Sequence, residues 1–270
     1  MSLVAAIQMT SGYSVEENLA QASRLIAEAA ETGAHLAVLP ENFAIMARKE
    51  AERLAVAEAD GRGPIQDFLS TAARTHRVWL VGGTIPLQAK GEKNKVRAAC
   101  LLYDDQGALV ARYDKIHLFD VQLGNGERYY ESNGIEAGEA PVVADTPAGR
   151  LGLSVCYDIR FPELYRQLLD AGAEIVAVPS AFTAYTGRAH WEILVRARAV
   201  ENLVYVIAAA QSGRHPNGRE TYGDSMIVNP WGEVLARRPQ GPGIVTAACD
   251  LPKLKALRAQ LPSIEHRRIR

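Results

Sequence analysis

The chain has 270 residues, a length at which one α/β domain can bury a sizeable core. Its 30 basic and 31 acidic residues leave a formal net charge of −1, which offers no electrostatic basis for binding nucleic acid or anionic membranes. The three cysteines are far apart and form no CxxC pair, so we expect no disulfides or metal site, and a reducing cytoplasm. We also expect no signal peptide and no membrane-spanning segment.

Short apolar runs alternate with amphipathic segments in the first half of the chain. Ser14 and Glu17 form a capping box for a helix whose apolar face extends to Ala29. A second helix is expected from Pro64, because proline suits the first helical position. Asp104 to Gly107 separate two apolar runs and predict a hairpin. The predicted strands are 3–8, 36–39, 78–84, 98–103 and 109–113.

The second half repeats this alternation. Helices are predicted from Pro162 to about Asp170, over about 189–201, and from about Pro252. No long linker or low-complexity segment divides the chain, so we predict a single domain over residues 1–270, with two sheets covered by outer helices. The predicted strands are 142–144, 151–155, 175–178, 204–210, 225–228, 234–236 and 244–249.

Cys156 lies at the end of the apolar run 151–155 and shortly before the helix expected at Pro162. The carboxyl end of a buried strand is where α/β proteins usually place their chemistry. The partial positive charge of a helix N-terminus would favour the thiolate over the thiol. Free cysteines are also among the most buried residue types, so this segment alone leaves both a nucleophile and a packing residue open.

Three further polar residues follow apparent strands. Glu41 comes after Leu39 and Pro40, Lys115 follows the run 109–113, and Glu131 comes later in the chain. Taken singly, they could be a helix-cap carboxylate, a solvated lysine and a surface acid, because these residue types are usually exposed. Their shared position at strand ends is what makes them candidates for one site.

Three segments carry a resemblance to a known family. Residues 39–42 (LPEN), 113–119 (YDKIHLF) and 153–163 (LSVCYDIRFPE) resemble carbon–nitrogen hydrolases of the nitrilase superfamily, and the similarity runs almost from end to end. The resemblance implies a Glu–Lys–Cys triad at Glu41, Lys115 and Cys156, with Glu131 as a second glutamate beside it. It also implies a four-layer α-β-β-α sandwich that pairs through outer helices into a homodimer, and it implies no cofactor or metal.

Amide hydrolysis needs a nucleophile, a proton carrier and a charge that stabilises the oxyanion. Cys156 would form a thioester, and Glu41 would carry protons in both half-reactions. Lys115 would stabilise the oxyanion, together with the backbone N–H of Tyr157 that the resemblance implies. Thiol hydrolases of other folds pair cysteine with histidine, so a histidine base is the rival hypothesis. The two candidates for such a base are His117 and His190.

Further segments resemble the branch of the superfamily that hydrolyses amides of 2-oxo acids. These segments are 181–192, 208–215, 222–226 and 264–268. The implied substrate is deaminated glutathione, in which a ketone replaces the glutamyl amino group, and the products would be 2-oxoglutarate and cysteinylglycine. The alternatives are hydrolysis of 2-oxoglutaramate or another small carboxyamide, and a catalytically silent protein that only binds its ligand.

A substrate with two carboxylates calls for arginines in the pocket. Arg160 is the candidate for the 2-oxo-acid carboxylate, although an ion pair with Asp158 or Glu163 would explain it equally well. Arg214 is the candidate for the glycine end, with a solvated loop arginine as the alternative, and Thr183 either lines the pocket or packs. The predicted core packing residues are Cys100, Trp191, Trp231 and Cys249.

Overall fold

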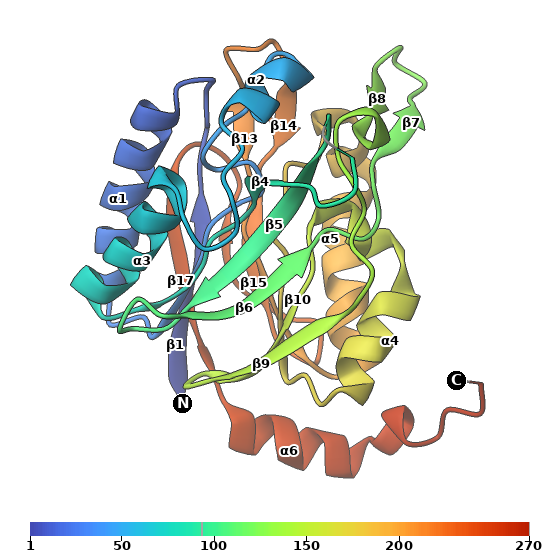
Figure 1. The fold of residues 1–270 in the computed structure, drawn as a ribbon. Helices are drawn as coiled ribbons and strands as arrows, with labels where there is room; N and C mark the ends of the chain where they lie inside the picture. Colours follow the sequence, from blue (N-terminus) through green and yellow to red (C-terminus); the bar gives the residue numbers. More distant parts are fainter. Residues whose placement is uncertain (93, 270) are drawn as a thin grey trace.

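The computed structural model describes residues 1–92 and 94–269. Within them, two β-sheets lie face to face and helices cover the outer side of each (Figure 1). The first sheet consists of β1 (Ser2–Gln8), β2 (Leu36–Val38), β3 (Trp79–Val81), β4 (Ile85–Gln88), β5 (Val96–Tyr103), β6 (Leu109–Asp114) and β17 (Gly243–Cys249). Their order is β17-β1-β2-β3-β5-β4, and β6 pairs with β5.

The second sheet repeats the pattern of the first. It consists of β9 (Val142–Thr146), β10 (Gly149–Leu153), β11 (Ile175–Ala177), β12 (Tyr205–Ala208), β15 (Ser225–Val228) and β16 (Val234–Arg238), in the order β16-β15-β12-β11-β10-β9. Strands β10, β11 and β12 run parallel, as do β1, β2 and β3 in the first sheet. Because parallel strands end at the same edge, the loops after them converge there.

Helices α1 (Val15–Glu31) and α3 (Pro64–His76) cover the first sheet, while α4 (Pro162–Asp170) and α5 (Ala184–Asn202) cover the second (Figure 1). The predicted α-β-β-α sandwich is therefore confirmed. Two further helices, α2 (Glu50–Ala55) and α6 (Leu251–Gln260), lie outside these layers. Within the described residues, no helix is long and apolar enough to cross a membrane.

Alternating side chains on the central strands build two cores. In β1, Val4 and Ala6 join Leu153 of β10 in the core between the sheets. Ala5 and Ile7 face the other way, into the core beneath α1 and α3. This period of two is what a strand buried on both faces requires, and it explains why β1 is almost wholly apolar.

The structure differs from the sequence prediction in several short elements. Helix α5 begins at Ala184, five residues before the predicted start, because the Thr183 hydroxyl caps it by accepting a 3.2 Å hydrogen bond from the Thr186 N–H. Trp231 was predicted to pack in the core, but it lies in a turn and is 61% exposed. Two hairpins were not predicted: β7 (Asp120–Gln122) with β8 (Arg128–Tyr130), and β13 (Ser212–Arg214) with β14 (Glu220–Tyr222).

Candidate active site

Loops that follow three strands place Glu41, Lys115 and Cys156 in the wall of one pocket. Glu41 follows β2, Lys115 follows β6, and Cys156 follows β10 of the second sheet. Glu131, just after the hairpin of β7 and β8, lines the same pocket. The site therefore draws on both sheets, and it needs the face-to-face arrangement of the sandwich to exist.

Cys156 begins a 3-10 helix over Cys156–Arg160 with a backbone φ of 47°. This left-handed conformation is unusual for a residue with a side chain and carries a cost in conformational energy. The Cys156 N–H donates a 2.8 Å hydrogen bond to the Pro179 carbonyl, which holds the turn against the loop after β11. Its thiol lies at the pocket wall and is almost fully buried.

Lys115 lies between two carboxylates. Its Nζ donates hydrogen bonds to Glu41 Oε1 at 2.8 Å and to Glu131 Oε2 at 2.7 Å. The second oxygen of Glu41, Oε2, accepts a 2.9 Å hydrogen bond from the Ala181 N–H. An ammonium group has three N–H donors, so one remains for a substrate oxygen.

Two close backbone approaches fix the loops of Lys115 and Glu41. The Gly138 N–H donates a 2.8 Å hydrogen bond to the Lys115 carbonyl, and a Cβ at Gly138 would lie 2.0 Å from the Asp114 carbonyl oxygen. A Cβ at Gly83 would lie 2.1 Å from the carbonyl oxygen of Pro40, the residue before Glu41. Both positions therefore require glycine, and both set the position of a catalytic candidate.

The charges of the pocket favour a neutral thiol. Burial raises the pKa of Cys156 well above its ordinary value and the Glu41 carboxylate raises it further, while the Lys115 charge offsets only part of this. Burial opposes the charge on Lys115, yet the neighbouring Glu131 and Glu41 carboxylates outweigh it and raise the pKa of the lysine. Burial likewise opposes the charge on Glu131, but Lys115 holds the pKa of that carboxyl below its ordinary value.

The expectation that a helix N-terminus would favour the Cys156 thiolate is therefore wrong for the resting site. One ammonium and two carboxylates give the set Glu41–Lys115–Glu131 a net charge of −1, and Arg219 adds one positive charge in the pocket wall. Ionising the thiol would place a further negative charge in a buried space beside the Glu41 carboxylate. Transfer of the proton from Cys156 to Glu41 leaves the total charge unchanged. The geometry thus favours proton transfer coupled to attack.

Asp158 ties the loop of Lys115 to the turn of Cys156. Its buried carboxylate accepts hydrogen bonds from the Tyr113 hydroxyl at 2.7 Å and from the Val155 and His117 N–H groups at 2.8 and 3.0 Å. The His117 ring binds the same carboxylate through Nδ1 and stacks on Phe161.

The histidines predicted as rival bases do not line the pocket of Cys156. His117 is held against Asp158, and His190 Nδ1 lies 3.2 Å from the guanidinium of Arg160. Glu41 and Glu131 both line this pocket, and Glu41 is the one whose charge and side-chain hydrogen bonding act on the Cys156 thiol. The geometry therefore favours the glutamate as the proton carrier.

The predicted binding residues divide into two groups. Tyr157 and Thr183 line the pocket, and the Tyr157 N–H lies in the first turn of its helix, where backbone donors have no intrahelical partner. Arg160 does not line this pocket: it lies over the rings of Tyr157 and Phe182, and its guanidinium contacts His190 rather than Asp158 or Glu163. Arg214 is not brought to the triad: it lines a separate cavity beside β13 and β14.

Arg219 is the arginine of this loop that does line the pocket of Cys156, and sequence reasoning missed it. It donates a hydrogen bond to the Ala181 carbonyl and lies over the ring of Tyr129. The signal was present in Asn217 and Gly218, a dipeptide typical of two-residue hairpin turns. That turn reverses the chain, so Arg214 and Arg219 end on different cavities.

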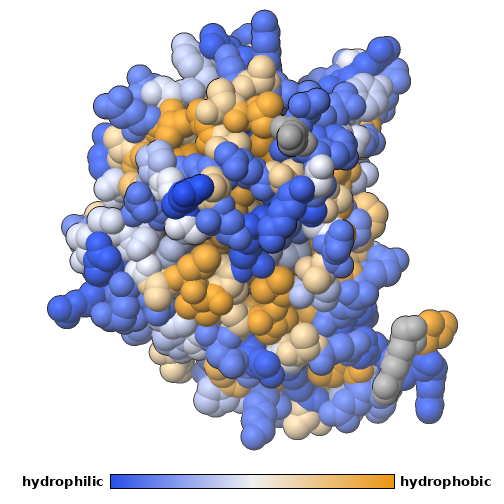
Figure 2. Space-filling model, viewed as in Figure 1, coloured by the Kyte–Doolittle hydropathy of each residue, from blue (hydrophilic) through white to orange (hydrophobic). Residues whose placement is uncertain are grey.

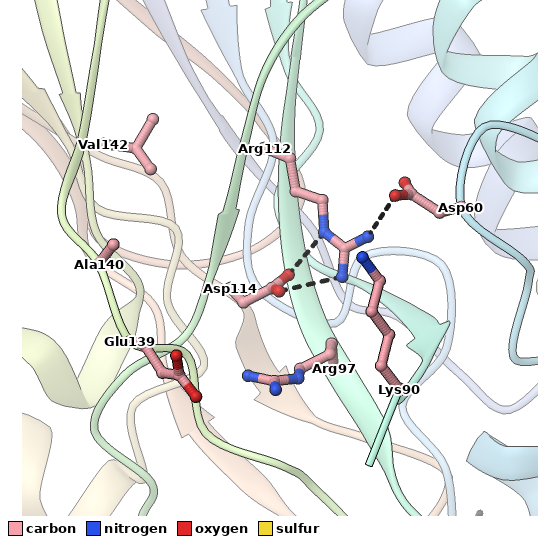
Figure 3. Close-up of a pocket in the computed structure, with 8 residues that line it drawn as sticks. All are labelled: Asp60, Lys90, Arg97, Arg112, Asp114, Glu139, Ala140 and Val142. Carbon is pink, nitrogen blue, oxygen red and sulfur yellow. Dashed lines mark hydrogen bonds and ion pairs between the residues drawn. The ribbon is translucent and has the colours of Figure 1, made fainter.

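Other surface cavities do not contain the triad. One of about 360 Å³ lies between β5, β6 and the segment before β9, and its charges largely pair with one another (Figure 3). There Arg112 binds both Asp60 and Asp114, and Arg97 binds Glu136, which the figure does not draw. Among the described residues, no group of three or more His, Cys, Asp or Glu side chains is arranged as a metal site.

The fold brings a buried thiol, a carboxylate and an ammonium into one pocket, and these are the groups that a thiol-dependent hydrolase needs. The sequence profile of the carbon-nitrogen hydrolase family matches residues 3–259. The chain therefore belongs to the carbon–nitrogen hydrolase family, and it is an enzyme that hydrolyses carbon–nitrogen bonds. This sets aside the alternative of a protein that only binds its ligand.

Individual relatives extend the match over almost the whole chain. A protein of Synechocystis named deaminated glutathione amidase is 45% identical over 267 residues, which are 98% of this chain and 97% of that protein. The crystal structure of the C. elegans NitFhit protein gives a TM-score of 0.91 at 38% identity, over 99% of this chain and 65% of NitFhit.

A third comparison concerns the cysteine. An amidase from Nesterenkonia sp. AN1 gives a TM-score of 0.80 at 28% identity, over 97% of this chain and 98% of that one. That structure is of a glutamate-to-glutamine mutant, with acrylamide joined to its active-site cysteine by Michael addition.

Proposed function

We propose that the chain is an amidase that hydrolyses deaminated glutathione through a thioester on Cys156, with Glu41, Lys115 and Glu131 as the other catalytic residues. The observation that carries the chemistry is the hydrogen-bonded set Glu41–Lys115–Glu131 in the same pocket wall as the thiol. The substrate class is supported by full-length similarity to proteins named deaminated glutathione amidase.

The first half-reaction forms the thioester. The sulfur of Cys156 attacks the amide carbonyl carbon while the thiol proton moves to Glu41. The third N–H of Lys115 and the backbone N–H of Tyr157 stabilise the resulting oxyanion, and each such donor typically contributes roughly 10²–10³ in rate. The carbon–nitrogen bond then breaks as Glu41 returns the proton to the leaving amine.

The second half-reaction hydrolyses the thioester. Glu41 takes a proton from a water molecule as the water oxygen attacks the acyl carbon, and the same donors hold the second oxyanion. The carbon–sulfur bond breaks, and Glu41 returns the proton to the sulfur. The products are the carboxylic acid, here 2-oxoglutarate, and the free amine, here cysteinylglycine. Glu131 keeps Lys115 oriented throughout because it accepts one of its hydrogen bonds.

Hydrolysis of 2-oxoglutaramate is the second candidate function, and one observation favours it. The free space inside the pocket of Cys156 is only about 10 Å³, which is barely one water molecule. A tripeptide-sized substrate therefore needs side chains at the pocket mouth to move, while a small amide needs less movement.

The test is a direct comparison of kcat/KM on deaminated glutathione and on 2-oxoglutaramate. We expect the higher value on deaminated glutathione, and a higher value on the small amide would overturn the substrate assignment. Mass spectrometry during turnover of a slow amide should show an acyl group on Cys156. The Cys156→Ala variant should show no adduct and no turnover, with a circular dichroism spectrum like that of the parent.

We further propose that the chain acts as a homodimer in the cytoplasm. The outer face of α5 supports the dimer, because Ile193 and Val200 are exposed on it, seven residues apart, beside the exposed Trp231. By contrast, the face in Figure 2 carries separate apolar patches among hydrophilic side chains. A reducing compartment fits three cysteines that form no disulfide, of which Cys156 must stay a free thiol.

A further inference from the structure

A second cavity adjoins the pocket of Cys156. Its volume is about 310 Å³, and it shares two wall residues, Glu131 and Arg219, with that pocket. It lies between the segment around α2, strand β8 and the turn between β13 and β14. We call it the basic vestibule, after the five cationic side chains in its wall: Arg48, Lys49, Arg53, Arg128 and Arg219.

The vestibule has an excess of positive charge. Its wall holds two carboxylates, Glu50 and Glu131, and the second of these is already bound to Lys115. Of the five cations, Arg48 pairs with Glu52, and within residues 1–92 and 94–269 the other four form no ion pair. The charged cavity of Figure 3 is different, since acids neutralise its arginines. The vestibule is therefore the one of these two cavities that would attract an anion.

Arg219 separates the two cavities. Its guanidinium binds the Ala181 carbonyl and lies 5.2 Å from the ring centre of Tyr129, so it bridges the two sides of the pocket mouth. Its Nε is buried and has no hydrogen-bond partner among the described residues. A buried donor without a partner is costly, and a ligand carboxylate between the two cavities would satisfy it.

The positions of Glu41 and Glu131 determine which half of the substrate points toward the vestibule. Glu41 and Glu131 offer carboxylate oxygens, which accept hydrogen bonds, so the amide N–H of a substrate faces them. Glu131 and the residue after Glu41, Asn42, also line the vestibule. The leaving-amine half therefore points into the vestibule. In an extended dipeptide of about 7 Å, its terminal carboxylate would reach well beyond the pocket mouth.

We propose that the basic vestibule is the subsite that binds a carboxylate at the far end of the leaving amine. Arg219 lies between the pocket of Cys156 and this subsite, so the leaving-amine half of the substrate passes it and contacts it. This inference rests on the proposed function, because deaminated glutathione carries such a carboxylate on its glycine. Arg53 and Arg128 lie in the wall of this subsite and, unlike Arg219, do not line the pocket of Cys156. A substrate without the second carboxylate therefore gains little from them.

The first test compares two substrates across two pairs of variants. The double variant Arg53→Gln/Arg128→Gln should lower the ratio of kcat/KM on deaminated glutathione to kcat/KM on 2-oxoglutaramate at least about tenfold, mostly through KM. The matched control is Arg188→Gln/Arg214→Gln, in a cavity that shares no wall residue with the pocket of Cys156. In the control variant, the ratio of the two kcat/KM values should equal that of the parent enzyme. An unchanged ratio in the vestibule variant would overturn the subsite.

The second test changes the ligand. Deaminated glutathione with its glycine carboxylate converted to an amide should be a poorer substrate of the parent enzyme by at least about tenfold, and the vestibule variant should barely distinguish the two forms. Equal kcat/KM for both forms in the parent would refute the subsite while leaving the proposed function intact. If the parent hydrolyses only 2-oxoglutaramate, the proposed function itself fails, so the two failures are distinct.

Discussion

At the scale of single residues, the state of Cys156 follows from charge and burial in three dimensions. Burial raises the pKa of the thiol, the Glu41 carboxylate raises it further, and the Lys115 ammonium offsets part of this rise. The sequence places Cys156 near a helix start, which alone would suggest the opposite shift. Glu41 therefore has two effects on the thiol: it is positioned to take the proton, and its charge keeps that proton in place until attack.

Replacing Glu41 by glutamine should separate these two effects. Glu41→Gln removes one of the causes that raise the Cys156 pKa, so the pH midpoint of alkylation by iodoacetamide should move to lower pH. Amide turnover should fall roughly 10²–10⁴-fold, because the proton carrier is gone. The alkylation rate measured against pH by mass spectrometry checks the first effect, and kcat checks the second.

The control for this prediction is Glu139→Gln, which removes a carboxylate from the separate cavity of Figure 3. It should change neither the alkylation midpoint nor kcat. A midpoint that moves to higher pH in Glu41→Gln would contradict the electrostatic account of the thiol.

At the scale of elements, the site depends on how the loops after β6 and β10 are joined. Asp158 accepts hydrogen bonds from both loops, through Tyr113 and His117 on one side and Val155 on the other. It is fully buried, so its charge is balanced by hydrogen bonds rather than by water. Lys115 and Cys156 each lie within two residues of these contacts.

Asp158→Asn should therefore affect both stability and activity. In the parent, several donors share the two oxygens of the Asp158 carboxylate, whereas asparagine offers them a single acceptor oxygen. The free energy of unfolding should therefore fall by at least about 2 kcal/mol. Urea unfolding measures this change, and kcat, measured where the variant is folded, should also fall. The variant His117→Ala, which removes only the ring contact, should cost less on both counts. Parent-like stability in Asp158→Asn would rule out this role.

The elements also show which parts of the site could be predicted from sequence. Glu41, Lys115 and Cys156 each lie within three residues of the end of a strand, so their positions could be predicted from the local sequence pattern and from the resemblance. Arg219 follows a three-residue strand and a turn, which are too short for a period of two to be recognised.

The position of the Arg219 loop depends on a contact that is distant in sequence. His215 is buried, with Nδ1 donating to the Ser11 carbonyl and Nε2 accepting from the Thr221 hydroxyl. Burial lowers the pKa of this histidine, which matches a neutral ring between one acceptor and one donor. No local pattern predicts a bond between residues 11 and 215, so the choice between Arg214 and Arg219 required the structure.

At the scale of the whole molecule, layer order was predictable while surface assembly was not. The two halves of the chain each build three parallel strands with covering helices, and this repeat is visible in the apolar runs. The sequence could not predict that Trp231 is exposed, because an aromatic residue in a turn can either pack into the core or face the solvent. The homodimer stays a prediction that the exposed face of α5 supports.

Ile193→Glu tests that assembly. Ile193 is an exposed apolar side chain on the outer face of α5, so a carboxylate there would be buried against the symmetry mate in a dimer, and the dissociation constant should rise at least about 100-fold. Sedimentation velocity should show a dimer for the parent and a monomer for the variant. Leu109→Glu, which changes an exposed apolar residue on β6, is the control and should stay dimeric. A dimer that persists in Ile193→Glu would place the interface elsewhere.

The left-handed backbone at Cys156 has a consequence for engineering. At a φ of 47° glycine would relieve a cost of about 1–2 kcal/mol, yet only cysteine supplies the sulfur. Screening a library of this protein for heat resistance alone would thus reward the loss of the nucleophile, and a screen that keeps the enzyme must select for turnover in the same round.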